Sequence, residues 1–304
     1  MHDHETTVGF IGLGSMGCGM ATRLVATGVD LQVFDLRPEA VQALVELGAT
    51  AAENVASLGR SCKRVILSLP DARVVEQVLF GADGLMNSLA PGSCVVDCGT
   101  THPEVTRDMA QRLAQAQIAL LDAPVTGMES RAAEGTLTIM AGGDKEAYEA
   151  CQPLFEAMGE LVIHMGSSGN GQLMKMTNNV LYNISVAAMA EMLPLAVRLG
   201  LDPEQVQRVV SSGSGQSFGF DYFSTRAMQG IFDQGYPMAS AYKDMIALME
   251  CANQQHAPMP VASGAMQTYR AALAEGYGHE AKGAMIKVWE RVLGVEVRSK
   301  ETSK

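Results

Sequence analysis

The sequence has no excess of basic residues. Its 304 residues include 22 Lys and Arg against 33 Asp and Glu, which gives a formal net charge of −11 at pH 7. Proteins that bind nucleic acid neutralise phosphates with Lys and Arg gathered in patches. The charge balance therefore argues against nucleic acid as a partner.

The cysteines lack the spacing of a disulfide framework or of a zinc site. The six Cys are scattered, with no CxxC pair and no short Cys/His spacing. We interpret them as buried thiols of a protein in a reducing compartment, and we predict no metal site.

Long uninterrupted hydrophobic runs and internal repeats are missing as well. The most apolar stretch, around residues 184–197, contains Glu191 and Pro194. We predict that it is too short and too interrupted to span a bilayer. No signal peptide precedes the first predicted strand, so we expect a cytoplasmic protein with no membrane partner.

The chain is long enough for about two domains, and its hydrophobic fraction of 47% is sufficient for large cores. Up to about residue 166, short apolar runs alternate with helical segments. This alternation predicts an α/β fold with a mostly parallel sheet that helices cover on both faces. The predicted strands cover residues 65–70, 94–97, 119–122, 137–140 and 161–164, and the predicted helices cover 38–47, 72–79, 103–115 and 145–158.

After the glycine-rich segment 166–171 the pattern is helical only. Residues 172–199 are predicted to form one helix about 40 Å long, at 1.5 Å per residue. That length exceeds one small layer and indicates a helix that joins two domains. Further helices are predicted at 202–212, 222–229, 239–255, 261–275 and 281–293.

A glycine-rich turn of the form GxGxxG lies between a predicted strand at 8–11 and a predicted helix at 20–26. A second strand, at 31–34, ends in Asp35. Such glycines permit a tight turn, close approach to a pyrophosphate and close helix packing, while the helix N-terminus offers N–H groups to phosphates. The residues of the turn are Gly12, Leu13, Gly14, Ser15, Met16 and Gly17.

Asp35 follows the glycines by roughly 20 residues and is suited to bind the ribose hydroxyls of a dinucleotide. We therefore predict NAD as the preferred cofactor. NADP is the alternative, because Arg37 could pair with a 2′-phosphate. The predicted architecture is an N-terminal Rossmann domain at residues 1–166 and an all-helical domain at residues 167–304, joined by the long interdomain helix.

Lys175 and Asn179 are four positions apart on the long predicted helix and therefore share one face. A lysine can exchange a proton with a substrate hydroxyl or carbonyl oxygen, and an amide can orient the substrate. Spacing alone favours the alternative, a solvated lysine near the start of a helix.

Five segments together resemble the β-hydroxyacid dehydrogenase family, which includes 3-hydroxyisobutyrate dehydrogenases and tartronate semialdehyde reductases. The resemblance implies a Rossmann domain, a helical C-terminal domain and a homodimer or homotetramer. It also implies NAD(P)-dependent oxidation of a small β-hydroxyacid, or reduction of the semialdehyde, with Lys175 as the general acid/base. The segments are GFIGLGSMG at 9–17, DAPVTG at 122–127, GTLTIMAGG at 135–143, GNGQ at 169–172 with Lys175 and Asn179, and Lys243-Asp244.

The resemblance also assigns contacts residue by residue. It implies that Thr126 and Gly127 hold the substrate carboxylate and that Asn179 contacts the substrate, while Lys243 faces the cofactor or the substrate. The further cofactor contacts that we predict, besides the glycine turn and Asp35, are Leu36, Arg37, Leu69, Pro70 and Thr100.

The chain departs from the family pattern at several positions. Cys98-Gly99 replaces the more usual pair of hydroxyl residues, and Ala281 stands where an Asp is common. Met128 stands where glycine is usual and Arg131 where a small residue is usual.

Met128 and Arg131 lead to a hypothesis on the substrate. The Arg131 cation could pair with a second anionic or strongly polar group of a β-hydroxyacid, and Met128 could narrow the room for a branched methyl. In the alternative Arg131 is structural or solvated, and specificity comes from the helical domain around Gln216, Phe218 and Tyr236.

Two other functions stay open. The first is an imine reductase or a larger-acid dehydrogenase of the same fold, but the imine-acting branch generally lacks the lysine that matches Lys175. The second is a non-catalytic NAD(P)-binding protein, which is expected to have lost Lys175 and gained a basic or partner-binding extension. The sequence shows neither change.

Overall fold

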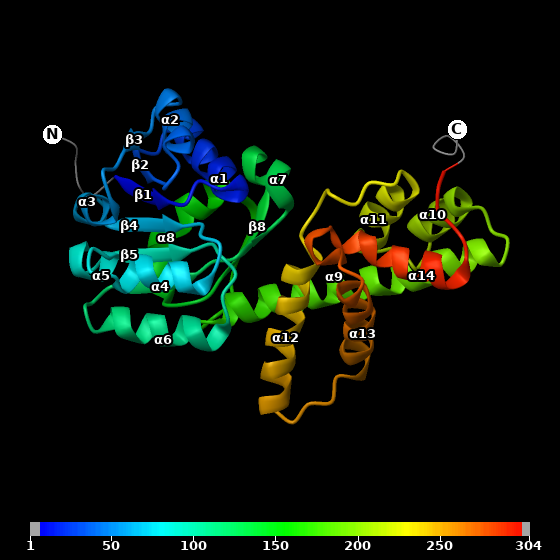
Figure 1. Cartoon of the computed structure of the whole chain (residues 1–304). Helices are drawn as coiled ribbons and strands as arrows, with labels where there is room; N and C mark the ends of the chain where they lie inside the picture. Colours follow the sequence, from blue (N-terminus) through cyan, green and yellow to red (C-terminus); the bar gives the residue numbers. More distant parts are fainter. Residues whose placement is uncertain (1–6, 300–304) are drawn as a thin grey trace. The chain divides into compact units, whose positions relative to one another are not determined.

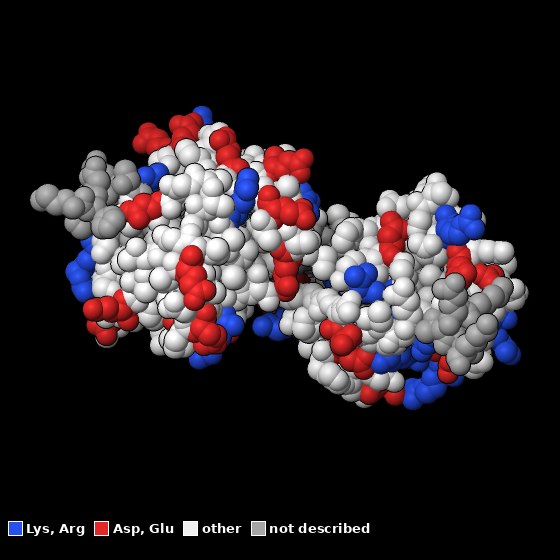
Figure 2. Space-filling view, turned by 90° about the horizontal axis from the view of Figure 1, so that it is seen from above, with Lys and Arg blue, Asp and Glu red and all other residues white. Residues whose placement is uncertain are grey.

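The computed structural model describes residues 7–299 of the chain. The chain forms two compact units, Met1–Lys175 and Met176–Lys304. Figure 2 shows acidic side chains spread over the face of the first unit rather than gathered in one place.

The first unit is built on a six-stranded sheet in which all neighbouring strands are parallel. The strand order is β3-β2-β1-β4-β5-β6. Because β1 is paired with both β2 and β4, the direction of chain progression reverses there, as in a Rossmann sheet. The strands are β1 Val8–Ile11, β2 Leu31–Phe34, β3 Thr50–Ala51, β4 Arg64–Leu67, β5 Cys94–Asp97 and β6 Ala119–Asp122.

Helices cover both faces of this sheet, as predicted (Figure 1). Strands β1, β4 and β5 are buried almost throughout, because successive side chains point to opposite faces and each face has its own core. The helices are α1 Ser15–Ala26, α2 Pro38–Glu46, α3 Val55–Ser61, α4 Ala72–Phe80, α5 Leu85–Ser88, α6 Pro103–Ala114 and α8 Lys145–Met158.

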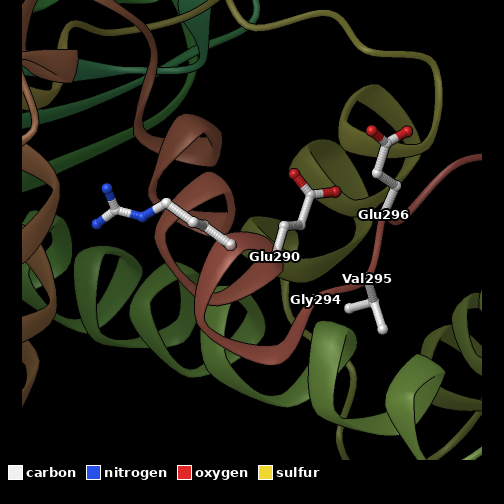
Figure 3. A pocket seen from close by; sticks show the side chains of 5 residues that line it. Glu290, Gly294, Val295 and Glu296 are labelled. Carbon is white, nitrogen blue, oxygen red and sulfur yellow. The ribbon is translucent and has the colours of Figure 1, made fainter.

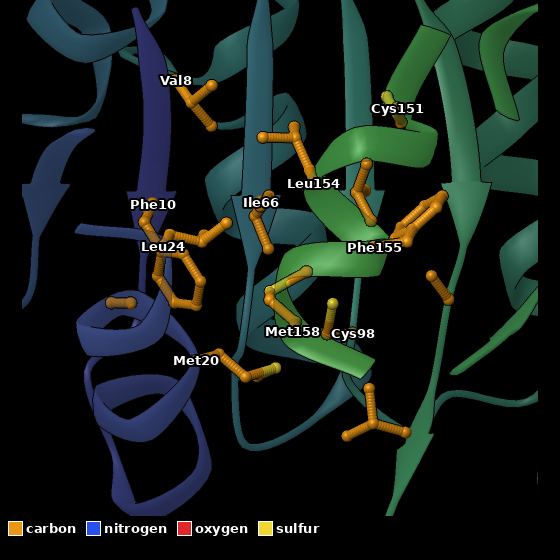
Figure 4. Close-up of a cluster of buried hydrophobic side chains, with 14 of the residues drawn as sticks. Val8, Phe10, Met20, Leu24, Ile66, Cys98, Cys151, Leu154, Phe155 and Met158 are labelled. Carbon is orange, nitrogen blue, oxygen red and sulfur yellow. The ribbon is translucent and has the colours of Figure 1, made fainter. Parts of the chain in front are cut away.

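Each face packs against its own set of helices. On one face, Phe10 and Ile66 of the sheet pack with side chains of α1 and α8, which Figure 4 shows in close-up. On the other face, Ile11 and Val65 pack with side chains of α3, α4, α5 and α6.

A second, three-stranded sheet follows in the order β7-β8-β9. Its strands are β7 Val125–Thr126, β8 Leu137–Ala141 and β9 Gly159–His164, and a short helix, α7 Met128–Glu134, lies between the first two in sequence. The apolar runs at 137–140 and 161–164 are strands, as predicted. They belong to this separate sheet, in which β7 and β8 are antiparallel and β8 and β9 parallel.

The second unit is helical. A core of buried side chains from α9, α11, α12, α13 and α14 holds it together. Its helices are α9 Asn170–Arg198, which begins in the first unit, α10 Pro203–Ser212, α11 Phe218–Met228, α12 Met238–Gln254, α13 Pro260–Ala274 and α14 Ile286–Leu293, the last preceded by 3-10 turns at Tyr277–His279 and Lys282–Met285.

Helix α9 corrects the prediction that the apolar stretch around residues 184–197 is too short and too interrupted to span a bilayer. It runs through Pro194 without interruption for 29 residues, and by length and composition it is long and apolar enough to cross a membrane. Buried core helices meet the same description, and Val186, Ala190 and Leu193 of α9 lie in the core of the second unit. Glu191 lies on the exposed side of α9, where its carboxylate accepts a hydrogen bond from the Thr268 hydroxyl (2.6 Å).

Candidate active site

The three glycines of the GxGxxG turn have different surroundings. Gly12 has a left-handed φ of +96°, and a Cβ at this position would overlap the carbonyl oxygen of Ser68. A Cβ on Gly17 would overlap the carbonyl oxygen of Gly12, so the turn closes only without side chains at these two positions. Around Gly14 a Cβ would meet nothing within 4 Å. The middle glycine is therefore open toward a ligand.

Helix α1 begins directly after this opening. Gly14 is its N-cap residue and supplies no side-chain cap, and the first turn carries no acidic residue. The first intrahelical bond is that from the Cys18 N–H to the Gly14 carbonyl oxygen (2.8 Å). The uncapped N–H groups and the helix dipole favour an anion here, so these residues fit the pyrophosphate of a dinucleotide.

Asp35 is tied to the glycine turn by several hydrogen bonds. Its Oδ2 accepts from the Leu13 N–H (2.6 Å), and its Oδ1 accepts from the Arg37 N–H (2.8 Å) and from Arg37 Nε (3.2 Å). Burial raises the pKa of Asp35, but the hydrogen bonds from Leu13 and Arg37 outweigh burial and hold the pKa below its usual value. The Arg37 guanidinium also donates to the Leu13 carbonyl oxygen (2.7 Å). Asp35 is therefore a fixed anion beside the turn.

The other predicted cofactor contacts of this unit lie on loops that follow strands. Leu69 is half-buried, whereas Leu36, Pro70 and Thr100 are exposed. These loops lie at the carboxyl ends of β2, β4 and β5, the edge at which open parallel sheets bind ligands.

A buried polar network that the sequence analysis missed lies below Thr100. Asp97 accepts a hydrogen bond from the Gly99 N–H (2.9 Å), and Asp122 accepts from the N–H groups of Gly169 (2.8 Å) and Gln172 (3.0 Å). Asp97 and Asp122 are neighbours in the β5/β6 register. The sequence did contain a signal for them, because two predicted apolar strands in succession end in an aspartate.

The two carboxyls have perturbed acidities. Burial, with a smaller contribution from the negative charge of Asp122, raises the pKa of Asp97 to about 6, although the hydrogen bonds from Gly99 and Thr101 oppose the shift. Burial likewise raises the pKa of Asp122, although the N–H groups of Gly169 and Gln172 oppose that shift.

Lys175 lies against the segment that precedes Thr126. Its Nζ donates a hydrogen bond to the Val125 carbonyl oxygen (2.8 Å), and its side chain is half-buried. Thr126 and Gly127 are half-buried as well. The first unit therefore brings Lys175 to the segment for which the resemblance implies carboxylate binding.

Met128 keeps a glycine-like backbone. Its φ is +67°, in the left-handed region that side chains other than glycine rarely adopt. Its side chain is 40% exposed. The loop thus follows the path of a glycine although a large side chain occupies the position.

Arg131 already has partners within the first unit. Its guanidinium lies 3.4 Å from a carboxylate oxygen of Glu160 and donates to the Thr136 hydroxyl (3.4 Å). A substrate anion at Arg131 would compete with the exposed Glu160 for this cation.

The remaining predicted residues belong to the second unit. Asn179 donates from its side-chain amide to an Asp244 carboxylate oxygen (2.8 Å), so Asp244 orients this amide. Lys243 is exposed. Gln216 donates to Asp221 (2.6 Å), whereas Phe218 and Tyr236 are largely exposed.

A shallow depression at the end of α14 contains none of the predicted site residues (Figure 3). Its Glu290 accepts hydrogen bonds from the Val297 N–H (2.7 Å) and from Arg298 (2.8 Å), and its Arg291 pairs with Glu275. These charges are satisfied within the protein, and the bonds to Glu290 hold Val297 and Arg298 next to α14.

All six cysteines are in the reduced form, and Cys62, Cys94, Cys98 and Cys151 are buried. Burial raises the pKa of Cys62 to about 12. Within residues 7–299, no group of three or more His, Cys, Asp or Glu is arranged to hold a metal ion.

The strand order, the glycine turn and the anchored Asp35 define the class of protein: the first unit is a Rossmann domain that binds a dinucleotide. Residues 7–166 match the family described as the NAD binding domain of 6-phosphogluconate dehydrogenase. Residues 169–289 match the family described as NAD-binding of NADP-dependent 3-hydroxyisobutyrate dehydrogenase.

Full-length relatives show similarity over nearly the whole chain. 2-(Hydroxymethyl)glutarate dehydrogenase of Eubacterium barkeri is 36% identical over 291 residues, which are 95% of this chain and 97% of that protein. NAD-dependent L-serine dehydrogenase of Pseudomonas aeruginosa is 34% identical, over 94% of this chain and 99% of that protein. A crystal structure of 3-hydroxyisobutyrate dehydrogenase from Salmonella typhimurium has a TM-score of 0.85 at 30% identity and covers 93% of this chain and 100% of its own.

The chain therefore belongs to the β-hydroxyacid dehydrogenase family, as the sequence motifs indicated. It is an oxidoreductase, and its cofactor is NAD or NADP.

Proposed function

We propose that this protein transfers a hydride between NAD(P) and a small β-hydroxyacid, or the corresponding semialdehyde, with Lys175 as the general acid/base. The observation that carries the proposal is the hydrogen bond from Lys175 Nζ to the Val125 carbonyl oxygen (2.8 Å), directly before Thr126 and Gly127. The names of the relatives support the substrate class, since L-serine and 2-(hydroxymethyl)glutarate are both hydroxyacids.

A dinucleotide held by the glycine turn and Asp35 would supply the hydride acceptor for oxidation and the hydride donor for reduction. The Thr126 hydroxyl and the Gly127 N–H hold the substrate carboxylate. Lys175 in its neutral form accepts the proton of the substrate hydroxyl as the carbonyl forms. In the reverse direction its ammonium form returns that proton to the oxygen.

Further parts of the proposal concern the residues that surround this step. Asn179, held by Asp244, orients the substrate, and Lys243 contacts the substrate or the cofactor. Leu69, Pro70 and Thr100 contact the cofactor. A cytoplasmic homodimer or homotetramer is the assembly we propose.

NAD is the cofactor we propose as preferred. The Asp35 carboxylate is held in its ionised form beside the glycine turn, and such a charge binds ribose hydroxyls and repels a 2′-phosphate.

The substrate that we propose carries a second anionic or strongly polar group, which Arg131 would bind, with Met128 as pocket wall. The relative whose name denotes a glutarate, a dicarboxylate, supports this choice. The ion pair between Arg131 and Glu160 must then open when the substrate binds.

The test follows NADH formation with a panel of hydroxyacids that differ by one added carboxylate. Lys175→Ala should lower kcat by roughly 10²- to 10⁴-fold, the range for a lost general acid or base, while NAD binding measured by fluorescence changes little. Lys175→Arg should not restore activity, because a guanidinium does not release its proton in this pH range. Lys145→Ala, an exposed lysine on α8, is the matched control and should keep wild-type activity.

Retained turnover in the Lys175→Ala variant would contradict the role of Lys175. Turnover of imines but not of hydroxyacids would favour an imine reductase. Tight cofactor binding without turnover of any substrate would favour a non-catalytic NAD(P)-binding protein.

A further inference from the structure

We propose that Gln172 is a positioning residue that holds the loop after β5 and the helix bearing Lys175 at a fixed spacing, so that the catalytic lysine is correctly placed. This inference rests on the proposed function, because Gln172 acts through Lys175. All the contacts that carry it lie within the first unit.

The side chain of Gln172 binds the loop after β5 on both sides of Thr100. Its Nε2 donates to the Gly99 carbonyl oxygen (2.9 Å), and its Oε1 accepts from the Thr101 N–H (3.0 Å). Thr100 lies between these two and is exposed at the carboxyl end of β5. Gln172 itself is fully buried. A carboxamide is suited to this task, because it donates and accepts at the same time.

The backbone of Gln172 is fixed at the other end of the network. Its N–H donates to Asp122 Oδ2 (3.0 Å), and the Gly169 N–H donates to Asp122 Oδ1 (2.8 Å). The first N–H groups of a helix lack intrahelical partners, so the Asp122 carboxylate anchors the start of α9. Lys175 lies three positions further along this helix.

The network therefore connects two parts of the site whose relative positions must be fixed for hydride transfer. One is the loop at the edge where the sheet binds ligands, and the other is Lys175, whose Nζ lies on the Val125 carbonyl oxygen. A misplacement of about 1 Å at a reacting centre can cost about 100-fold in rate. Loss of the carboxamide should therefore lower the rate of the chemical step more than it lowers binding.

Two substitutions test this role. Gln172→Ala removes both side-chain hydrogen bonds and should lower kcat by about 10- to 100-fold, with little change in the Kd for ADP-ribose, which binds at the glycine turn. Gln172→Glu keeps the size of the side chain but places a carboxylate oxygen against the Gly99 carbonyl oxygen. When this carboxyl is protonated, its O–H replaces the lost donor.

The expected signature is a pH dependence specific to Gln172→Glu. Its kcat relative to wild type should rise as the pH falls and the introduced carboxyl takes up a proton. Asp97 and Asp122 are the carboxyls in the same network, and the wild-type profile over the same pH range accounts for their titration. Gln77→Glu, at an exposed position on α4, makes the same charge change. Its kcat relative to wild type should not change with pH.

Two results would overturn the proposal. One is a Gln172→Ala variant whose melting temperature falls while kcat stays at the wild-type value, since that behaviour belongs to a packing residue. The other is a ratio of variant to wild-type kcat that does not change with pH for Gln172→Glu. If the Gln172→Ala variant does not fold, this pH measurement alone tests the proposal. Failure of the proposed function is separate, because it appears as activity that survives Lys175→Ala.

Discussion

At the scale of single residues, the cofactor preference depends on the fixed anion at Asp35. The Leu13 and Arg37 N–H groups bind both carboxylate oxygens, and the lowered pKa keeps the group ionised across the physiological range. We expect kcat/KM with NAD⁺ to exceed that with NADP⁺ by about tenfold or more, which corresponds to about 1.4 kcal/mol. Steady-state kinetics with both cofactors measures this ratio.

A matched pair of variants tests the cause of the preference. Asp35→Ser removes the repulsion of a 2′-phosphate and releases the Arg37 guanidinium. The ratio of kcat/KM with NAD⁺ to kcat/KM with NADP⁺ should therefore fall. Glu39→Gln removes an exposed acid two positions after Arg37 and should leave the ratio unchanged. A wild-type preference for NADP⁺ would show that Arg37, rather than Asp35, governs recognition.

Met128 shows what a sequence can and cannot tell about one position. The motif identifies the place where glycine is usual, and the large side chain there suggests either a changed pocket or a changed loop path. The structure retains the left-handed path, with φ at +67°. For a residue other than glycine this conformation costs about 1 kcal/mol, a cost that the sequence pattern alone does not reveal.

At the scale of elements, two glycines of the turn before α1 serve different purposes. Gly17 is required by packing, because its Cβ would overlap the Gly12 carbonyl oxygen. Gly14 has ordinary extended backbone, with φ at −65°, and open space around it. We expect Gly17→Ala to lower the melting temperature and Gly14→Ala to leave it unchanged or slightly higher, since alanine has less unfolded-state entropy to lose.

Cofactor binding should depend on Gly14 even though stability does not. Gly14→Ala should weaken NAD binding although its fold is intact, because its methyl group occupies the space through which the backbone approaches the pyrophosphate. Thermal melts without cofactor and fluorescence titrations with NAD measure the two effects separately. Wild-type affinity in a stable Gly14→Ala variant would mean that the dinucleotide does not approach this residue.

The sequence predicted the buried strands and the longer helices well, because an apolar run and a helical period are both local features. The strands at 94–97 and 119–122 and the helix at 145–158 lie at the predicted residues. Short elements such as α7 and β7 escaped, since seven and two residues are too few to show a period. The separate sheet of β7, β8 and β9 was also missed, because the partner of a strand is not written in its own residues.

Helix α9 lies close to the predicted residues 172–199, but the length of its apolar stretch was underestimated. Pro194 and Glu191 looked like interruptions of an apolar segment, yet the helix continues through both. Glu191 lies on the exposed side of the helix, and its carboxylate accepts a hydrogen bond from the Thr268 hydroxyl. Thr268 belongs to α13, far away in the sequence, and no local pattern contains this contact.

At the scale of the whole molecule, the network around Asp97, Asp122 and Gln172 shows the limit of reasoning from sequence. The motif GNGQ and the strand-terminal aspartates were visible in the sequence. Their pairing was not, because Gln172 and Thr101 are 71 positions apart. The backbone groups of this network are satisfied only when the complete first unit has folded, so its energetics belong to the unit rather than to any one element.

The buried Asp97 should therefore make global stability depend on pH. Its pKa is raised to about 6 from an ordinary value of about 4, so the folded state binds the proton more tightly than the unfolded state. Between these two values stability must fall as the pH rises, because the folded state still holds a proton that the unfolded state has released. The shift of about two pKa units corresponds to about 3 kcal/mol of lost stability at neutral pH.

Asp97→Asn should remove this loss, since its amide oxygen can still accept the hydrogen bond from the Gly99 N–H and carries no charge to bury. We expect the free energy of unfolding of the variant, relative to wild type, to increase by up to about 3 kcal/mol between pH 4 and pH 7. Urea denaturation of both proteins at several pH values measures the difference, and groups that titrate alike in both cancel. Asp83→Asn, an exposed position, controls for net charge and should show no such trend. A stability difference for Asp97→Asn that stays constant over this range would mean that the Asp97 carboxyl is not destabilised by burial, and that Gly99 and Thr101 compensate its charge in full.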